Sequence, residues 1–278
     1  MPELPEVETI KRGLEKHLVG HKILEVKILD LKIFSGKKEN LINGQVLAIK
    51  RVGKGLIIEF TNEYSLAIHV KMTGQLIYQG PKAMPLSPKV GGVLPNKHTR
   101  VIFILDRSAK LFYNDVRRFG WLKVILKNDV MSLPFFKGMG PEPFKDLTVE
   151  YLEKIFSKIN TPIKTLLMDQ AKIGGIGNIY ANEALWQVKI NPKRMANELT
   201  RSEVKRLYKA IHDVMEESIR HGASSSENYV DALGQEGRYQ EHFEVYGRTG
   251  EQCNRCGNKI ERIVIGGRGT FVCMRCQV

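Results

Sequence analysis

The chain of 278 residues carries 43 Lys and Arg against 30 Asp and Glu, which gives a formal net charge of +13 at pH 7. Its length favours two domains with a real hydrophobic core, and no stretch approaches the roughly twenty consecutive apolar residues that a membrane helix needs. The positive charge suits a polyanionic partner, because neutralising phosphates releases condensed counterions, although charge alone also fits a basic protein without such a partner.

The chain begins with MPELPEVETIKRGLEKHL, in which apolar residues recur at intervals of three and four and predict an amphipathic helix. This segment has no apolar run of signal-peptide length, so a cytoplasmic location is expected. Pro2 follows Met1 directly, and removal of Met1 would leave a proline amine beside Glu3. Such an amine can attack a sugar C1′ and form a permanently cationic iminium, while Glu3 supplies an acid and base for opening the sugar ring. A chain that begins Met-Pro can equally carry an inert proline.

From residue 22 to residue 125 the pattern changes to short β-branched runs, such as QVLAIKRV, GLIIEF and RVIFILD, which are separated by Gly, Asn, Asp and Ser. These runs predict a β-sandwich or a flattened barrel that carries the N-terminal helix. A stretch rich in Pro and Gly, residues 128–146, marks the domain junction. The helical period then returns and predicts a mainly α second domain, which ends in a long polar loop at residues 223–237.

Within the helical part, KIGGIGNIY at residues 172–180 is a Gly-rich loop that ends where a helix begins. Its glycines allow a phosphate to approach backbone N–H groups, and the helix N-terminus adds a favourable dipole. No predicted strand precedes it, as a dinucleotide site would require, so a helix–turn–helix that binds nucleic acid fits better than a nucleotide cofactor site. The alternative is a purely structural turn between two helices.

The cysteines form two Cys-x-x-Cys pairs near the C-terminus, separated by sixteen residues: Cys253, Cys256, Cys273 and Cys276. This spacing can close a tetrahedral thiolate shell around zinc, and a reducing compartment favours metal ligation over disulfides. Four protein ligands leave no vacant position, so the zinc is expected to be structural. The segment between the pairs predicts a β-hairpin with Arg268 at its tip, either gripping a phosphate or solvated at the surface.

Four segments occur in this order in one chain: MPELPEVET, NDVRRFG, GGIGNIYANEAL and VYGRTGEQCNRCGNKIERIVIGGRGTFVCMRC. With them the sequence closely resembles formamidopyrimidine-DNA glycosylase, a bacterial family that removes oxidised purines, over essentially its whole length. The resemblance implies an α+β fold, with an N-terminal β-sandwich and flanking helix, a helix–two-turn–helix domain and a β-hairpin zinc finger. The expected boundaries are 1–131 for the sandwich, 132–146 for the linker, 147–237 for the helix–two-turn–helix domain with its lesion loop, and 238–278 for the finger.

The resemblance also implies the catalytic residues. Pro2 would be the Schiff-base nucleophile and Glu3 the adjacent acid and base. Lys54 matches a hairpin lysine that contacts the phosphate beside the lesion and assists catalysis; without the resemblance it would be a solvated turn lysine. Arg268 completes the catalytic set, and together with Lys54 and Asn178 it would grip the DNA backbone and kink the duplex at the damaged nucleotide.

Three more residues match the side chains that fill the space left by an everted base: Met72, Arg117 and Phe119. Without the resemblance Met72 and Phe119 would be assigned to the core. The loop at residues 223–237 matches a flexible cover over the everted purine. Further contacts with DNA or the lesion are expected from His98, Lys164 and Tyr239.

The implied activity is excision of 8-oxoguanine and formamidopyrimidines from double-stranded DNA through a Schiff base at Pro2, followed by β,δ-elimination. It would need one structural zinc ion, no nucleotide cofactor and no second copy of the chain. The endonuclease-VIII-like branch, which prefers oxidised pyrimidines, ranks lower because the chain starts MPELPEV and contains NDVRRFG. A zinc-dependent DNA-binding protein without catalysis is the other rival, against which the presence of Pro2, Glu3 and Lys54 argues.

Overall fold

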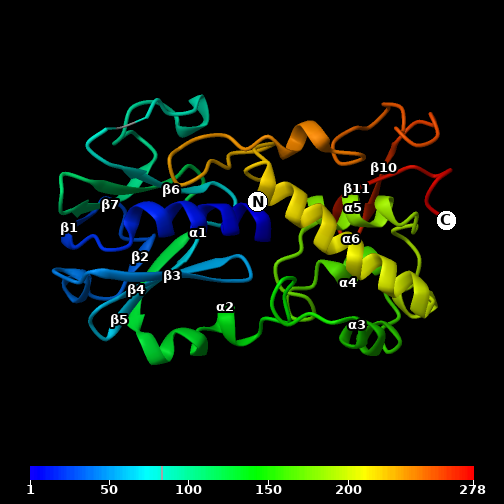
Figure 1. Cartoon of the computed structure of the whole chain (residues 1–278), viewed down its shortest axis with the longest axis horizontal. Helices are drawn as coiled ribbons and strands as arrows, with labels where there is room; N and C mark the ends of the chain where they lie inside the picture. The colour runs from blue at the N-terminus through cyan, green and yellow to red at the C-terminus, as the bar shows by residue number, and fades with distance from the viewer. Residues whose placement is uncertain (83) are drawn as a thin grey trace. The chain divides into compact units, whose positions relative to one another are not determined.

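The computed structural model describes residues 1–82 and 84–278. The chain divides into two compact units, one of residues 1–137 with 219–240, the other of residues 138–218 with 241–278 (Figure 1). Each unit has its own secondary structure, mostly β in the first and mostly α in the second. Among the described residues, no helix combines the length and the apolar character that crossing a membrane requires.

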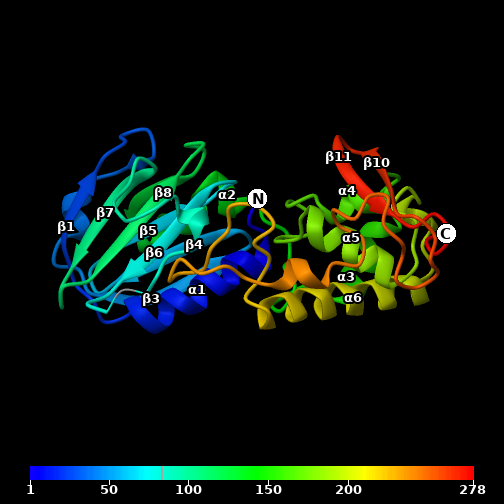
Figure 2. The same cartoon turned by 90° about the horizontal axis from the view of Figure 1, so that it is seen from above.

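In the described part of the first unit, two sheets and the long helix α1 (Leu4–Leu18) are the main elements (Figure 2). The first sheet has the strand order β1-β7-β8-β6 and the second the order β2-β9-β5-β4-β3. All neighbouring strands are antiparallel except β2 and β9. The strands are β1 (Ile23–Ile28), β2 (Phe34–Ser35), β3 (Val46–Val52), β4 (Gly55–Phe60), β5 (Tyr64–His69), β6 (Gly74–Gln79), β7 (Thr99–Leu105), β8 (Lys110–Asp115) and β9 (Trp121–Leu126).

A large cluster of buried apolar side chains in the described part of this unit joins both sheets to α1. The periodic residues of the helix, from Val7 to Leu18, are at most 1% exposed, and they pack with apolar side chains from strands of both sheets. The predicted β-sandwich with a flanking helix is therefore confirmed. Short helical segments complete this unit: η1 (Lys38–Leu41), η2 (Pro88–Val90), η3 (Lys127–Ser132) and α2 (Pro134–Lys137).

The polar loop at residues 223–237 belongs to the first unit, whereas the sequence boundaries group it with the helical domain. Backbone hydrogen bonds run from Tyr78 N–H to the Ala232 carbonyl (2.7 Å) and from Ser87 N–H to the Gly234 carbonyl (2.9 Å). Gln75 also donates to the Asn228 carbonyl at 2.8 Å. These bonds tie the loop to β6 and to the segment that follows it. The partners lie some 150 residues earlier in the chain, so the position of the loop in the sequence does not reveal which unit it joins.

The second unit is built from helices and one hairpin. The helices are α3 (Val149–Phe156), α4 (Ile163–Leu167), η4 (Ala196–Glu198), α5 (Asn178–Gln187) and α6 (Arg201–Arg220), and the hairpin pairs β10 (Glu261–Ile265) with β11 (Arg268–Val272). Helix α5 is buried on almost every side, as expected of a helix at the centre of its unit. Gln170 shapes the Gly-rich loop before it, accepting from Gly175 N–H and donating to the Ile176 carbonyl.

Candidate active site and nucleic-acid interface

The start of the chain is held in place at the N-terminus of α1. Pro2 is buried, and Glu3 is 4% exposed. Met1 is present, so the Pro2 nitrogen is an amide, and the Met1 amine forms an ion pair with the carboxylate of Glu227 in the polar loop. Removal of Met1 would turn the Pro2 nitrogen into the basic secondary amine that nucleophilic attack requires.

Glu6 fixes the backbone around Pro2 and Glu3, a role that the sequence did not assign. One carboxylate oxygen of Glu6 accepts from Glu3 N–H at 2.9 Å, and the other accepts from Ser224 N–H at 3.0 Å. The first bond satisfies an N–H at the helix start that has no partner within the helix. With Glu6 only 2% exposed, a single buried carboxylate joins the N-terminus to the polar loop.

Lys54 occupies the tight turn between β3 and β4, where Gly53 has a φ of 56° that suits glycine. It is 4% exposed, unlike the solvated lysine that a turn would ordinarily carry. Arg51 braces this turn by donating to the Gly53 carbonyl at 3.0 Å and to Glu8 at 2.8 Å. Although burial raises the pKa of Glu8, the bonds from its arginine partners outweigh it and leave that pKa below its ordinary value.

His69, at the end of β5, lies close enough to Lys54 to sense its charge. Burial, and then the positive charges of Lys71 and Lys54, lower the pKa of His69 to about 3. Its ring packs edge-on against Phe135 at 4.5 Å between centroids. His69 is therefore neutral at physiological pH and adds no positive charge next to Lys54.

Three residues predicted to fill the space of an everted base lie together in the first unit. The Arg117 guanidinium stands 4.7 Å from the ring centroid of Phe119, and its Nη1 lies 3.1 Å from the Met72 sulfur. Phe119 is 52% exposed. This is a large exposed fraction for a phenylalanine, and packing in the core does not explain it. The three side chains form a cluster of apolar and planar groups, in which Met72 is half-buried and Arg117 and Phe119 are exposed. We call this cluster the wedge.

Asp115 fixes the two loops that carry the wedge, one with Met72 and the other with Arg117 and Phe119, relative to each other. One carboxylate oxygen accepts from the Thr73 hydroxyl at 2.5 Å and the other from Gly120 N–H at 2.8 Å, while the Thr73 hydroxyl accepts from Arg117 N–H at 2.9 Å. Arg118, between the two wedge residues of this loop, has a φ of 58°, a conformation that costs energy for a residue with a side chain. Fully buried Asp115 thus compensates for a strained turn.

We expect Asp115→Asn to lower the free energy of unfolding by about 1–3 kcal/mol, because the amide would point a donor at either the hydroxyl or the Gly120 N–H. Chemical denaturation followed by circular dichroism measures this loss. The matched control is Asp129→Asn at an exposed position, where the change should stay within about 0.5 kcal/mol. Equal stability of the two variants would contradict the role given to Asp115.

His98 precedes β7 and is half-buried beside the wedge. Its backbone carbonyl accepts from Asp115 N–H at 2.9 Å, and its own N–H donates to the Asn96 side chain at 2.9 Å. Burial, followed by the charges of Lys97 and Arg100, lowers the pKa of His98. A neutral imidazole at this position can donate or accept a hydrogen bond, so its predicted DNA contact stays a prediction.

In the second unit, Asn178 and Lys164 meet the hairpin next to Arg268. The Asn178 amide donates to the Gly269 carbonyl at 3.1 Å, and the Lys164 ammonium donates to the same carbonyl at 3.0 Å and to the Thr270 hydroxyl at 2.6 Å. Arg268 itself is exposed and follows a turn of two glycines with positive φ. The structure therefore presents Arg268 on a hairpin that is held in place by Lys164 and by Asn178, the first residue of α5.

Lys164 differs from its expected role as a DNA contact. Its side chain is 1% exposed, and its ammonium is engaged inside the unit by Gly269 and Thr270. We assign it to support of the hairpin, since a buried charge is retained where hydrogen bonds satisfy it. Tyr239, the other loosely expected contact, is 2% exposed and donates its N–H to the Ala223 carbonyl at 3.1 Å.

Another buried carboxylate, Glu183 of α5, holds the segment that leads into the cysteine-bearing C-terminal residues. It accepts from three successive backbone N–H groups, of Glu244 (2.9 Å), Val245 (3.1 Å) and Tyr246 (2.7 Å). Burial raises the pKa of Glu183 to about 7, even though the three N–H donors act in the opposite direction. No local pattern predicts this contact, because Glu183 lies about sixty residues before its partners in the chain.

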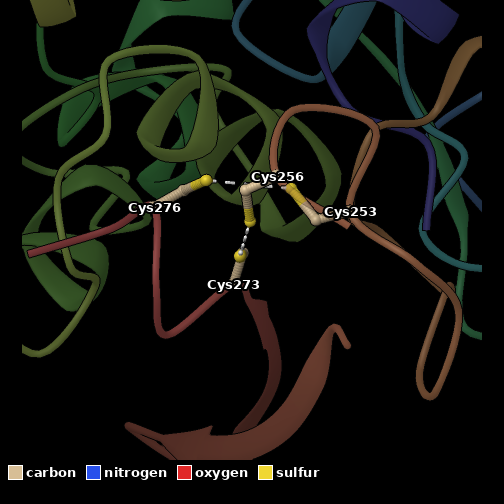
Figure 3. Close-up of side chains that lie close together, drawn as sticks. All are labelled: Cys253, Cys256, Cys273 and Cys276. Atoms are coloured by element: carbon tan, nitrogen blue, oxygen red, sulfur yellow. Dashed lines mark hydrogen bonds between the residues drawn. The ribbon is translucent and has the colours of Figure 1, made fainter. Parts of the chain in front are cut away.

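The four cysteines form a metal site (Figure 3). Their sulfurs all lie within 4.8 Å of one another, with 3.9 Å between Cys253 and Cys276 and 3.5 Å between Cys256 and Cys273. A tetrahedral Zn²⁺ with Zn–S bonds of 2.3 Å separates its sulfurs by about 3.8 Å, so the thiolates fit this ion. The predicted zinc site is confirmed, and its four-thiolate set makes it structural.

Comparison with known proteins agrees with both units. Three family models match: "Formamidopyrimidine-DNA glycosylase N-terminal domain" over residues 1–122, "Formamidopyrimidine-DNA glycosylase H2TH domain" over residues 139–230, and "Zinc finger found in FPG and IleRS" over residues 250–278. The second of these corresponds to the helix–two-turn–helix domain that the resemblance implied.

Similar full-length proteins carry the same family name. The formamidopyrimidine-DNA glycosylases of Pelotomaculum thermopropionicum and Desulforamulus reducens are 40% and 41% identical, each over 100% of this chain and 99% of the relative. Among solved structures, Lactococcus lactis Fpg bound to DNA containing N7-benzyl-Fapy-dG and MutM bound to DNA containing carbocyclic 8-oxo-G align with TM-scores of 0.88 and 0.87. Both are 34% identical and cover 99% of each chain. The chain therefore belongs to the formamidopyrimidine-DNA glycosylase family.

Proposed function

We propose that this protein is a bifunctional DNA glycosylase and abasic-site lyase that removes oxidised purines, 8-oxoguanine and formamidopyrimidines, from double-stranded DNA. The observation that carries the proposal is the N-terminus: Pro2 and Glu3 are buried at the start of α1, and the Glu6 carboxylate fixes their backbone. Solved relatives contain DNA with Fapy-dG, carbocyclic 8-oxo-G or an abasic site, which supports the same class of substrate here.

Chemistry at Pro2 follows from its free amine. The neutral nitrogen bonds to C1′ of the everted nucleotide, and the bond from C1′ to the base breaks as the base leaves with its electron pair. The nitrogen gives up its N–H proton in this step, and the departing base takes a proton up. Glu3 protonates the ring oxygen, so that the sugar opens to a cationic iminium. The iminium acidifies the C2′ proton, whose removal expels the 3′ phosphate; a second elimination expels the 5′ phosphate and leaves a one-nucleotide gap.

Phosphate-binding side chains and the wedge supply DNA recognition in this proposal. Lys54 in the first unit, with Asn178 and Arg268 in the second, would bind backbone phosphates, and the excess of 13 positive charges would favour encounter with DNA. The wedge is already assembled, with Arg117 and Phe119 exposed, so its planar and apolar groups can replace the stacking that an everted base gives up. The polar loop at residues 223–237 would cover that base.

The proposed reaction requires only groups that one chain supplies. One N-terminal amine and one zinc finger per chain suffice for the reaction, so we propose a monomer that uses no nucleotide cofactor. The zinc ion would stabilise the finger that carries Arg268, and it would not activate water, because four thiolates occupy its coordination positions. Because the curated relatives come from bacteria, we place its action at the nucleoid, in the cytoplasm.

Excision assays on matched duplexes test the substrate. We expect faster release of 8-oxoguanine and formamidopyrimidines, opposite cytosine, than of oxidised pyrimidines in the same sequence. Single-turnover rates under excess enzyme provide the comparison, and an undamaged duplex is the control. Equal or faster excision of the oxidised pyrimidines would overturn the purine assignment and favour the endonuclease-VIII-like alternative.

A further inference from the structure

The zinc site touches an indole. Trp186 stands near the C-terminal end of α5 and is 8% exposed. It packs in one buried cluster with Val245, Ile260 and two of the cysteines, against which the other two cysteines and Phe271 also lie. One face of the metal site is therefore formed by a side chain of α5, outside the tail that contains the ligands.

The contact between the indole and the site is directional. Trp186 Nε1 donates to the Cys253 sulfur at 3.4 Å, and the indole nitrogen has no acceptor capacity, so the direction of this bond is fixed. The same sulfur receives backbone N–H groups of Arg255 and Cys256. Four thiolates around Zn²⁺ leave two net negative charges in an apolar cluster, and N–H donors are what stabilises them there.

Arg255, between the two cysteines of the first pair, fixes the orientation of the indole. Its guanidinium lies 3.9 Å from the Trp186 ring centroid, a cation–π contact. It also donates to the Trp186 carbonyl at 2.9 Å and to the Gln187 carbonyl at 3.3 Å. A cation on the last carbonyls of a helix is favourable, so the first Cys-x-x-Cys pair and the end of α5 hold each other.

The opposite end of α5 holds the hairpin. Asn178 contacts the Gly269 carbonyl, and the Asn182 side chain accepts from Phe271 N–H at 2.8 Å. One helix thus contacts the metal ligands at its C-terminal end and the strand of Arg268 at its N-terminal end.

We propose that Trp186 is an outer-shell ligand of the zinc site, whose indole N–H stabilises the Cys253 thiolate and raises the affinity of the site for zinc. The proposal concerns the metal site alone and does not depend on the DNA chemistry. Partners in the outer shell of metal sites commonly account for about 10–100-fold in metal affinity. Loss of the indole N–H is expected to fall at the lower end of that range, since two backbone donors remain.

Trp186→Phe removes the N–H and keeps an aromatic ring for Arg255 and the apolar cluster. We expect about tenfold weaker zinc binding, measured by competition with a chromogenic chelator. We also expect a larger share of Cys253 alkylation by limiting iodoacetamide than in the parent protein, measured by peptide mass spectrometry. The matched control is Trp121→Phe, at the second of the two tryptophans, which lies in the first unit. Zinc affinity and Cys253 alkylation that are the same in both variants would overturn the proposal.

A second measurement keeps Trp186 in place and so does not depend on how Trp186→Phe folds. Trp121→Phe protein is loaded with ¹¹³Cd²⁺, which replaces Zn²⁺ among thiolates, and Trp186 is then the single indole in the NMR spectrum. We expect a scalar coupling between ¹¹³Cd and the indole proton across the Cys253 sulfur. A sharp indole resonance without this coupling would show that the hydrogen bond is absent in solution, and the proposal would fail.

Discussion

Pro2→Gly is expected to abolish most of the borohydride-trapped adduct that the processed protein forms with a duplex containing 8-oxoguanine opposite cytosine. Proline forms an iminium that has no N–H to lose and stays cationic, whereas a glycine amine gives an imine that becomes neutral on deprotonation. Removing the nucleophile of other covalent enzymes costs up to about 10⁶ in rate. Because glycine still presents an amine, we expect a smaller loss of the trapping rate, of at least about 10²-fold.

The control for this variant is Pro5→Gly, which changes the other proline of the N-terminal segment in the first turn of α1. Pro5 carries no amine terminus, so trapping should persist at a rate close to that of the parent protein. Intact mass must show that Met1 has been removed from all three proteins. Undiminished trapping by Pro2→Gly would mean that the imine forms elsewhere.

Cys256→Ser is expected to remove zinc and much of the DNA affinity. A serine hydroxyl is a poor zinc ligand at neutral pH, and three thiolates cannot close the tetrahedral site. Zinc binding contributes about 10–16 kcal/mol of apparent folding free energy in zinc-finger peptides, so the tail should lose its fold. The braced hairpin that presents Arg268 would then be lost, although the first unit has its own core and should remain folded.

Metal analysis and DNA titration measure these effects in one preparation. Zinc should fall from one ion per chain to near zero, with a large rise in the dissociation constant for DNA that contains an abasic-site analogue. Met274→Ser, an exposed position within the second Cys-x-x-Cys pair, provides the control and should keep both properties. Retained zinc together with unchanged DNA affinity in Cys256→Ser would refute the role of the finger.

Features with local causes could be predicted from the sequence. The four cysteines close on one another because their spacing suits zinc and a short hairpin joins the pairs. Alternation and helical periods depend on which face is buried, so the sandwich and α1 were also predictable. The wedge residues were identified only through the family motif, since exposure of Phe119 contradicts its hydrophobicity.

What could not be predicted depends on contacts between distant segments. Glu6 receives a bond from Ser224, and Glu183 receives three bonds from residues 244–246, and neither pairing has a signature in the local pattern. Lys164 carries the positive charge expected of a DNA contact, but tertiary packing places its ammonium on the hairpin. The hydrogen bonds that join the polar loop to β6 likewise appear only once the chain has folded.

The most direct measurement is mass spectrometry of the peptide that carries the reduced DNA adduct in the unmodified, processed protein. After borohydride trapping and digestion of protein and DNA, the account predicts a sugar remnant on the nitrogen of residue 2, within the N-terminal peptide. A remnant on the side chain of Lys54 or another lysine, or efficient strand cleavage with no adduct at all, would contradict it.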